Sequence, residues 1–251
     1  MSRMSHRDFL FVGGCVRSGT TALTRVLNAH PNVIVGEERY IQAWGKHKVR
    51  PAHFEKDRFL DYQEGDSTRG FYKFRDEADR FGNERYVGDK HPFVFWFYDD
   101  FEKHFDDANV VYILRNPVSV CESAQARADD PSDRFHMDGK RALGFWNDSL
   151  KRTLDALNKG ARIIVVCYED IFGSRGAISK LFDALKLNPD HADWARIDTL
   201  IKRANDVRTK LVPRNDALRL HVSMHGAFSL YRELIDRSLN RMDAAVGTVR
   251  T

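Results

Sequence analysis

The sequence from Phe9 to Thr21, FLFVGGCVRSGTT, decides the fold, together with the segment ALTRVL that follows it. A short apolar run enters a glycine-containing turn, and the turn leads directly into a segment with helical spacing. A strand–turn–helix unit of this kind points several backbone N–H groups and the positive end of the helix dipole at one place, where an anion can bind. The stretch therefore predicts a buried strand followed by an anion-binding loop.

One residue separates this loop from the usual nucleotide-triphosphate loop. From Gly14 to Thr21 the pattern is G-x-x-x-x-G-T-T, and Thr20 stands where a lysine would contact the β- and γ-phosphates. The basic residue lies inside the loop instead, at Arg17. The loop residues alone leave two other interpretations open, a plain strand–helix connection and a divergent nucleotide triphosphatase.

Short apolar runs recur along the chain and are separated by longer segments with helical spacing. Strands are expected at Phe9–Val12, Val33–Val35, Tyr86–Val87, Val110–Leu114 and Ile163–Cys167. Helices are expected at Thr20–Asn28, Pro92–His104, Pro117–Ala128, Gly139–Lys159, Ser174–Leu187, Trp194–Ala204 and Phe228–Met242. The strands do not alternate in polarity, as is typical of parallel strands buried on both faces. The pattern predicts an α/β fold, a P-loop-like three-layer domain with a central parallel sheet flanked by helices.

Length and composition limit the class of protein. The chain has 251 residues, and neither a linker nor an internal repeat marks a boundary, so one domain over residues 1–251 is expected. An apolar fraction of 42% argues against a disordered chain, and a net charge of +4 suits a small anionic ligand but is too small to indicate nucleic-acid binding. Three cysteines without CxxC spacing indicate neither a disulfide framework nor a zinc site.

Targeting signals are not visible in the sequence. The apolar run Phe9–Val12 is shorter than the roughly 7–15 apolar residues of a signal peptide, and no stretch has the roughly 20 of a membrane span. We therefore expect a soluble protein of the cytoplasm without an integral membrane segment.

A second strand–turn–helix unit lies between residues 109 and 127. Arg115 follows the apolar run, Pro117 stands at the first turn of the expected helix, and Ser123 lies further along it. Ligands of parallel sheets collect at the carboxyl ends of the strands, where Arg115 is expected. Two such strand ends, each with an arginine and hydroxyl groups, suggest one ligand with two separated anionic groups. The structural alternatives are a surface ion pair for Arg115 and a solvent-facing Ser123.

These motifs resemble the sulfotransferases, in particular their bacterial and tyrosylprotein branch. The resemblance rests on VRSGTT at 16–21, on RNP at 115–117 with Ser123 eight residues after Arg115, and on YEDI at 168–171. It extends through HP at 30–31, GEE at 36–38 and DKHPF at 89–93, and covers roughly residues 9–187. Sulfotransferases use 3′-phosphoadenosine 5′-phosphosulfate (PAPS) as co-substrate, release adenosine 3′,5′-bisphosphate (PAP), and need no metal.

The resemblance implies a role for each matching residue. The residues that would bind the 5′-phosphosulfate are Arg17, Ser18, Gly19, Thr20 and Thr21. Those that would bind the 3′-phosphate are Arg115, Ser123 and, one turn further on, Arg127, while Tyr168 corresponds to a tyrosine near the adenine. Glu38 falls at the position of the catalytic base, and Lys90 at that of a lysine beside the transferring group.

Sulfuryl transfer suits these residue types. The leaving phosphate oxygen gains negative charge, which Arg17 and Lys90 can stabilise, and the acceptor must lose a proton to a general base. Glu38 is one candidate base, and its structural alternative is a solvated carboxylate. His91 is a rival base, and its structural alternative is a hydrogen bond where the next helix begins.

The sequence leaves open the residues that close over the nucleotide, the acceptor and the class of activity. The family's arginine-lysine-glycine motif that closes over the nucleotide is absent, and Lys210, Arg214 or Arg219 could replace it. The acceptor, which would offer a hydroxyl or an amine, could be a small molecule, a saccharide or a peptide, and a homodimer is compatible with the sequence. A P-loop-type nucleotide kinase or triphosphatase and a non-catalytic nucleotide-binding module remain the alternatives.

Overall fold

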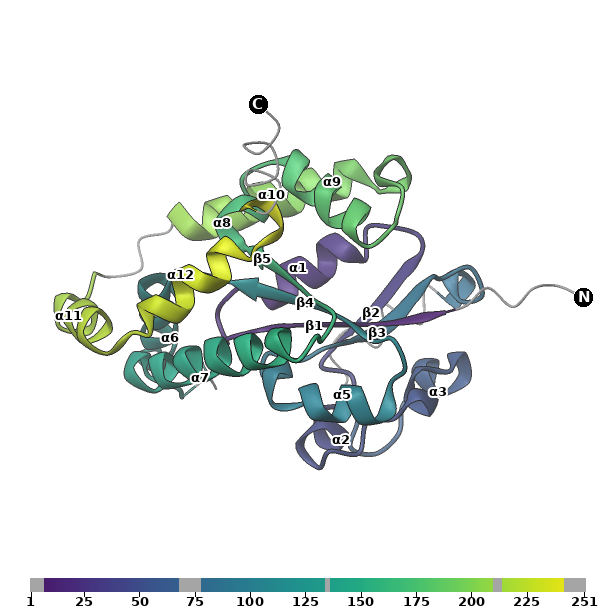
Figure 1. Cartoon of the computed structure of the whole chain (residues 1–251), viewed down its shortest axis with the longest axis horizontal. Coiled ribbons are helices and arrows are strands. Elements are labelled where there is room, and N and C mark those ends of the chain that lie inside the picture. Colours follow the sequence, from purple (N-terminus) through teal and green to yellow (C-terminus); the bar gives the residue numbers. More distant parts are fainter. Residues whose placement is uncertain (1–6, 68–77, 134–135, 210–213, 242–251) are drawn as a thin grey trace, which may run out of the picture.

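A sheet of parallel strands forms the centre of the molecule (Figure 1). The computed structural model describes residues 7–67, 78–133, 136–209 and 214–241. Within these residues the strands are β1 (Asp8–Gly14), β2 (Val33–Glu37), β3 (Tyr86–Lys90), β4 (Asn109–Leu114) and β5 (Ile163–Cys167), in the spatial order β2-β3-β1-β4-β5. All four pairings are parallel, so the predicted α/β fold with a central parallel sheet is confirmed.

Helices cover both faces of the sheet. The α-helices are α1 (Thr20–Leu27), α2 (Ile41–Gly45), α3 (Lys56–Leu60), α5 (Tyr98–His104), α6 (Pro117–Ala128), α7 (Gly139–Asn158), α8 (Tyr168–Ile171), α9 (Arg175–Ala184), α10 (Trp194–Thr209), α11 (Asp216–His225) and α12 (Phe228–Asp236). The 3₁₀ turns are η1 (Pro51–Phe54), η2 (Ala78–Arg80), η3 (Val94–Trp96) and η4 (Pro189–His191). Figure 1 shows α1, α9 and α10 on one face of the sheet, and α5 and α7 on the other.

The central strand β1 is buried from both sides. Leu10 and Val12 pack with residues of α1 and α9, whereas Phe11 packs into the aromatic cluster beneath the sheet. There Phe11 stacks on Phe101 of α5 with ring centroids 4.2 Å apart. Because successive side chains of a strand point to opposite faces, a strand covered on both sides must be apolar at every position. This explains the uninterrupted apolar run that the sequence shows here.

Strands β1 to β4 are longer than predicted, and β2 and β3 extend into residues that are not apolar. β3 continues through Gly88, whose Cα lies so close to β1 that an added Cβ would be 1.8 Å from the carbonyl oxygen of Leu10. It then ends on Asp89 and Lys90, both buried. β2 likewise continues to Glu37. Polar residues at the ends of buried strands mark the edge at which the candidate site is built.

The predicted helix Pro92–His104 is wrong in part, because it is interrupted. The chain forms η3 at Val94–Trp96 and only then α5 at Tyr98–His104. An added Cβ at Gly13 would meet the Val94 side chain at 2.0 Å, so the chain passes directly beneath β1 at this point. The prediction also missed α11, and its last helix, Phe228–Met242, was too long, because α12 ends at Asp236; Met242 itself lies outside the described residues. Within those residues no helix is long and apolar enough to cross a membrane.

Candidate functional site

The loop after β1 has the backbone of an anion-binding turn. Arg17 has a φ of 67° and Gly19 a φ of 93°, so the chain turns through two left-handed positions. An added Cβ at Gly19 would lie 2.7 Å from the Tyr168 ring, which is a second reason for glycine there. Helix α1 begins at Thr20 with no side-chain cap and no acidic residue in its first turn. Its first N–H groups and the positive end of its dipole are therefore not neutralised by the chain itself.

Ser18 has an unsatisfied hydroxyl group in this loop. Its side chain is only 1% exposed, and Oγ has no hydrogen-bond partner among the described residues. Buried hydroxyl groups nearly always have partners, because an unpaired one costs free energy. A hydroxyl left over beside the N-terminus of α1 fits a loop that is completed by a ligand oxygen.

The two strand ends predicted to bind anions are in direct contact. Arg17 Nε donates a hydrogen bond to Ser123 Oγ at 3.1 Å. Arg115 Nη1 donates to the carbonyl oxygen of Arg17 at 2.8 Å, and its guanidinium carbon lies 4.1 Å from the centroid of the Tyr168 ring. The structure thus brings together residues of the first loop, of β4–α6 and of α8.

Positive charge is concentrated at this contact. Burial, together with the neighbouring charges of Arg127 and Arg115, lowers the pKa of Arg17 to about 10. Arg17 stays protonated at neutral pH, so the site holds guanidinium groups that repel one another. Arg127 forms a bidentate ion pair with Asp133, with both N–O distances 2.5 Å. Asp133 also lies close enough to Arg17 to stabilise its charge, and an anionic ligand would relieve the same repulsion.

Glu38 and Lys90 meet at the neighbouring strand ends. Lys90 Nζ lies 2.6 Å from Glu38 Oε1, and the Glu38 N–H donates to the carbonyl oxygen of Lys90 at 2.9 Å. β2 ends at Glu37, and Glu38 is the first residue beyond it, with a φ of 60°. The adjacent Glu37 pairs with Arg25 of α1 at 2.9 Å and so has a structural role.

Sequence reasoning missed Asp89, which lies beneath this pair. The side chain is fully buried, and its carboxylate accepts hydrogen bonds from the backbone N–H groups of Arg39, Tyr40 and Lys90 and from the indole N–H of Trp44. The one available signal was its place in DKHPF at 89–93, directly before Lys90. Burial raises the pKa of Asp89 to about 6, against the effect of the hydrogen bonds from Arg39, Trp44 and Tyr40 and of the positive charge of Lys90.

His91 makes a hydrogen bond at the start of the next helical segment, which was the alternative to a role as base. Its Nδ1 accepts from the backbone N–H of Phe93 at 3.2 Å, at the start of the segment that leads into η3. Burial lowers the pKa of His91 to about 4, so the ring is neutral at physiological pH. A neutral ring that accepts at Nδ1 carries its proton on Nε2. In this tautomer Nε2 is a donor and not a base.

Of the three basic residues proposed to close over the nucleotide, two form ion pairs elsewhere. Arg219 pairs with Glu122 at 2.5 Å, and Arg214 pairs with Asp216 at 2.5 Å. Lys210 lies outside the described residues. Across the described part of the chain, no group of three or more His, Cys, Asp or Glu side chains is arranged to hold a metal ion.

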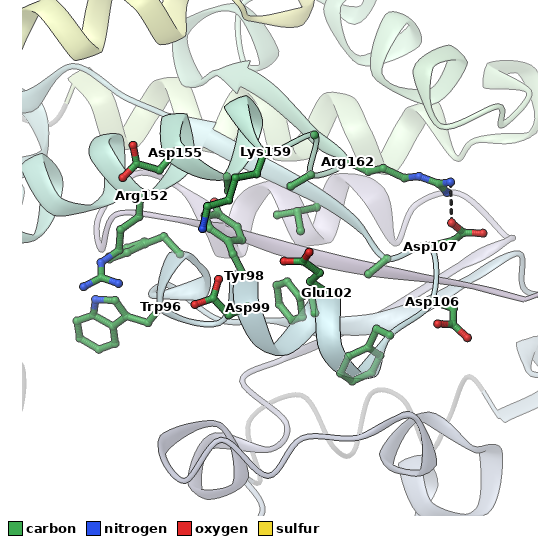
Figure 2. A pocket seen from close by; sticks show the side chains of 18 residues that line it. Trp96, Tyr98, Asp99, Glu102, Asp106, Asp107, Arg152, Asp155, Lys159 and Arg162 are labelled. Carbon is green, nitrogen blue, oxygen red and sulfur yellow. Dashed lines mark ion pairs between the residues drawn. The ribbon is translucent and has the colours of Figure 1, made fainter.

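A cavity of about 420 Å³ lies elsewhere, at the amino-terminal ends of β4 and β5. It is bounded by α5 on one side and the end of α7 on the other, with Glu102, Lys159 and Arg162 among its charged side chains (Figure 2). In a parallel sheet all strands run in the same direction. This cavity, at the amino-terminal ends of the strands, and the Arg17 loop, at their carboxyl ends, therefore lie on opposite sides of the sheet. None of the candidate site residues lines it.

Comparison with known proteins agrees with the fold and the motifs. A family model described as "Sulfotransferase family" matches residues 9–191, so the chain belongs to the sulfotransferase family. A solved sulfotransferase from Alicyclobacillus acidocaldarius is 20% identical, with 93% of this chain and 98% of that chain covered and a TM-score of 0.55. The sulfotransferase domain of the Synechococcus PCC 7002 olefin synthase is 19% identical, with the same coverage and a TM-score of 0.53. A comparison with curated proteins finds no significant match.

Proposed function

We propose that the protein transfers a sulfuryl group from PAPS to a hydroxyl or amine group of an acceptor. The observation that carries the proposal is the contact between the two anion-binding strand ends, through the Arg17–Ser123 hydrogen bond. A ligand bound between these strand ends can touch residues of both. Membership of the sulfotransferase family makes PAPS, which has a 5′-phosphosulfate and a 3′-phosphate, the ligand that fits.

The site residues divide between the two ends of this donor. The 5′-phosphosulfate is held by the loop 17–21, where the free N–H groups of α1 and the Ser18 hydroxyl supply donors. The 3′-phosphate is held by Arg115 and Ser123, with Arg127 beside them once Asp133 gives way. Tyr168 packs on Gly19 and Arg115 and so orients the arginine toward the nucleotide.

Transfer needs a base on the acceptor and positive charge on the leaving group. The acceptor oxygen or nitrogen forms a bond to sulfur while the bond from sulfur to the phosphate oxygen breaks, and PAP leaves. Glu38 accepts the proton that the acceptor loses. Lys90 pairs with the Glu38 carboxylate and, together with Arg17, stabilises the charge that grows on the phosphate oxygen.

The geometry favours Glu38 over His91 as the base. The Glu38 carboxylate, hydrogen-bonded to Lys90, offers oxygen atoms that can accept a proton, whereas the His91 tautomer presents an N–H group. His91 instead fixes the turn that follows Lys90. The acceptor itself is proposed only as a class, which includes small molecules, saccharides and peptides.

Radiolabelled PAPS and an extract of small molecules test the proposal. Incubation with the protein should move the label to an acceptor that mass spectrometry can identify, and Glu38→Gln should abolish most of that transfer. Binding of PAP without any transfer, to an acceptor or to water, would instead identify a non-catalytic nucleotide-binding module. Preferential binding of Mg²⁺–ATP would indicate a kinase or triphosphatase.

A further inference from the structure

Asp89 contacts neither the loop 17–21 nor the Arg115 region through any of its four hydrogen bonds. All four run instead to the segment that carries Glu38 and to Lys90. We propose that Asp89 is a positioning residue, whose carboxylate fixes the turn that presents Glu38 to the acceptor. The inference rests on the proposed function and deepens it, because it assigns a task to a buried group that the mechanism does not otherwise use.

The contacts divide evenly between the two carboxylate oxygens. Oδ1 accepts from the backbone N–H groups of Arg39 and Lys90, both at 3.0 Å. Oδ2 accepts from the Tyr40 N–H at 3.3 Å and from Trp44 Nε1 at 2.9 Å. The two residues directly after Glu38 are thus tied to β3, and the helix α2 that follows is tied to the same carboxylate.

Glu38 needs such support because its backbone is in an unfavourable conformation. A non-glycine residue with a φ of 60° is uncommon, and such positions persist only where the surroundings enforce them. Its own N–H is held by the Lys90 carbonyl oxygen, and its side chain by Lys90 Nζ. Asp89 and Lys90, adjacent on β3, therefore hold the backbone and the side chain of the same turn.

Fold stability alone gives a weak reason for an acidic residue here. Asp89 is fully buried in a strand, and burying a carboxylate is costly even when its hydrogen bonds are made. An apolar residue would suit the interior of β3 better. Gly36 also accommodates the carboxylate, because an added Cβ at this position would lie 2.6 Å from Asp89 Oδ1. The carboxylate thus occupies a space that the neighbouring strand leaves free for it.

Two variants disturb this carboxylate in different ways. Asp89→Asn keeps the shape but replaces one acceptor oxygen by an amide that cannot accept from N–H groups. Gly36→Ala keeps the charge but pushes on Oδ1. The matched control is Glu37→Gln, which removes a buried carboxylate from the same strand end and affects only the pair with Arg25.

The readouts separate positioning from stability. Turnover is measured as the release of labelled sulfate from PAPS with water as the acceptor, PAP affinity by calorimetry, and stability by thermal unfolding. A displacement of about 1 Å in a catalytic group can cost a factor of about 10². Asp89→Asn should therefore lower turnover by about that factor. Its PAP affinity should stay within about threefold of wild type, because none of its hydrogen bonds reaches the anion-binding residues. Gly36→Ala should likewise lower turnover and leave PAP affinity close to that of wild type.

The control decides what the result means. Glu37→Gln should lose thermal stability while keeping turnover, so a loss of turnover in Asp89→Asn cannot be a consequence of lower stability. Turnover close to wild type in Asp89→Asn would overturn the inference, and so would an equal loss in Glu37→Gln. If Asp89→Asn does not fold, the turnover of Gly36→Ala decides in the same way. A wild-type protein that neither binds PAP nor consumes PAPS would instead refute the proposed function, and this inference with it.

Discussion

Arg17 and Ser123 are 106 positions apart in the chain, and a hydrogen bond of 3.1 Å joins them. Each belongs to a separate strand–turn–helix unit, and each was predicted from local sequence to bind an anion. The bond brings the two units into contact at the carboxyl ends of the strands, where we propose that they form one continuous site. In a ligand-free chain, Arg17 and Ser123 satisfy each other, and a bisphosphate nucleotide would compete for both.

Arg17 should matter more to turnover than to product affinity. Its charge is most useful where the bridging oxygen becomes negative in the transition state. Arg17→Ala should therefore reduce turnover by a larger factor than it weakens PAP, as measured by steady-state kinetics and calorimetry. Because Arg17 has a φ of 67°, Arg17→Gly is the better variant, since glycine adopts this backbone without strain. Equal losses in turnover and PAP affinity would make Arg17 a simple anchor.

Glu38 and His91 should differ sharply as catalytic groups. Glu38→Gln keeps the size of the side chain and removes the base, so turnover should fall by about 10²–10⁴ while PAP affinity holds. His91→Asn should lower turnover about tenfold or less, because His91 only supports the following turn. A Glu38→Gln protein with near wild-type turnover and an inactive His91→Asn would reverse the assignment.

His91 should make the protein sensitive to acid. Burial lowers its pKa from 6.5 to about 4, so the unfolded chain binds the proton more readily than the folded one. Stability from the neutral ring is complete above about pH 6.5 and is lost as the pH falls toward 4. As the pH falls over that range, the free energy of unfolding of wild type should decrease by up to about 3 kcal/mol more than that of His91→Asn. Urea unfolding at several pH values measures the difference, and parallel curves for the two proteins would contradict it.

Asp133 should compete with the nucleotide for Arg127. Its two carboxylate oxygens hold the Arg127 guanidinium in the absence of ligand. Asp133→Asn should release Arg127 and leave the repulsion among Arg17, Arg115 and Arg127 less compensated. Calorimetry should then show PAP binding several-fold more tightly, with a steeper dependence on salt, because charge-assisted contacts to phosphate are strong. Weaker binding would mean that Asp133 orients Arg127 for the ligand.

The strands and the first loop could be predicted because their signals are local. An apolar run such as Val110–Leu114 and a pattern such as VRSGTT depend only on neighbouring residues, and the structure places both as expected. The proximity of Glu38 to Lys90 followed from the family resemblance, since it joins two separate strand ends. Their assigned roles in catalysis stay predictions.

Contacts between distant segments could not be predicted in this way. The role of Asp89 was not visible in the sequence, because three of its four donors belong to Arg39, Tyr40 and Trp44, which only the folded chain brings near. The pair of Arg127 with Asp133 also depends on how the chain turns after α6. The missed helix α11 has Asn215 as its cap but exposes Leu220 and Met224, so its apolar residues do not follow one buried face.

We propose that one nucleotide with a 5′ and a 3′ anionic group spans the strand ends that carry Arg17 and Arg115. Calorimetric titration of wild type and Arg115→Ala with PAP, AMP and ATP tests this directly. Wild type should prefer PAP, and Arg115→Ala should weaken PAP binding by about ten- to a hundredfold while weak AMP binding hardly changes. An arginine outside the site, Arg152 of α7 in its exposed pair with Asp148, provides the control, and Arg152→Ala should leave all three affinities unchanged. Equal losses for PAP and AMP in Arg115→Ala, or a wild-type protein that prefers ATP, would contradict the account.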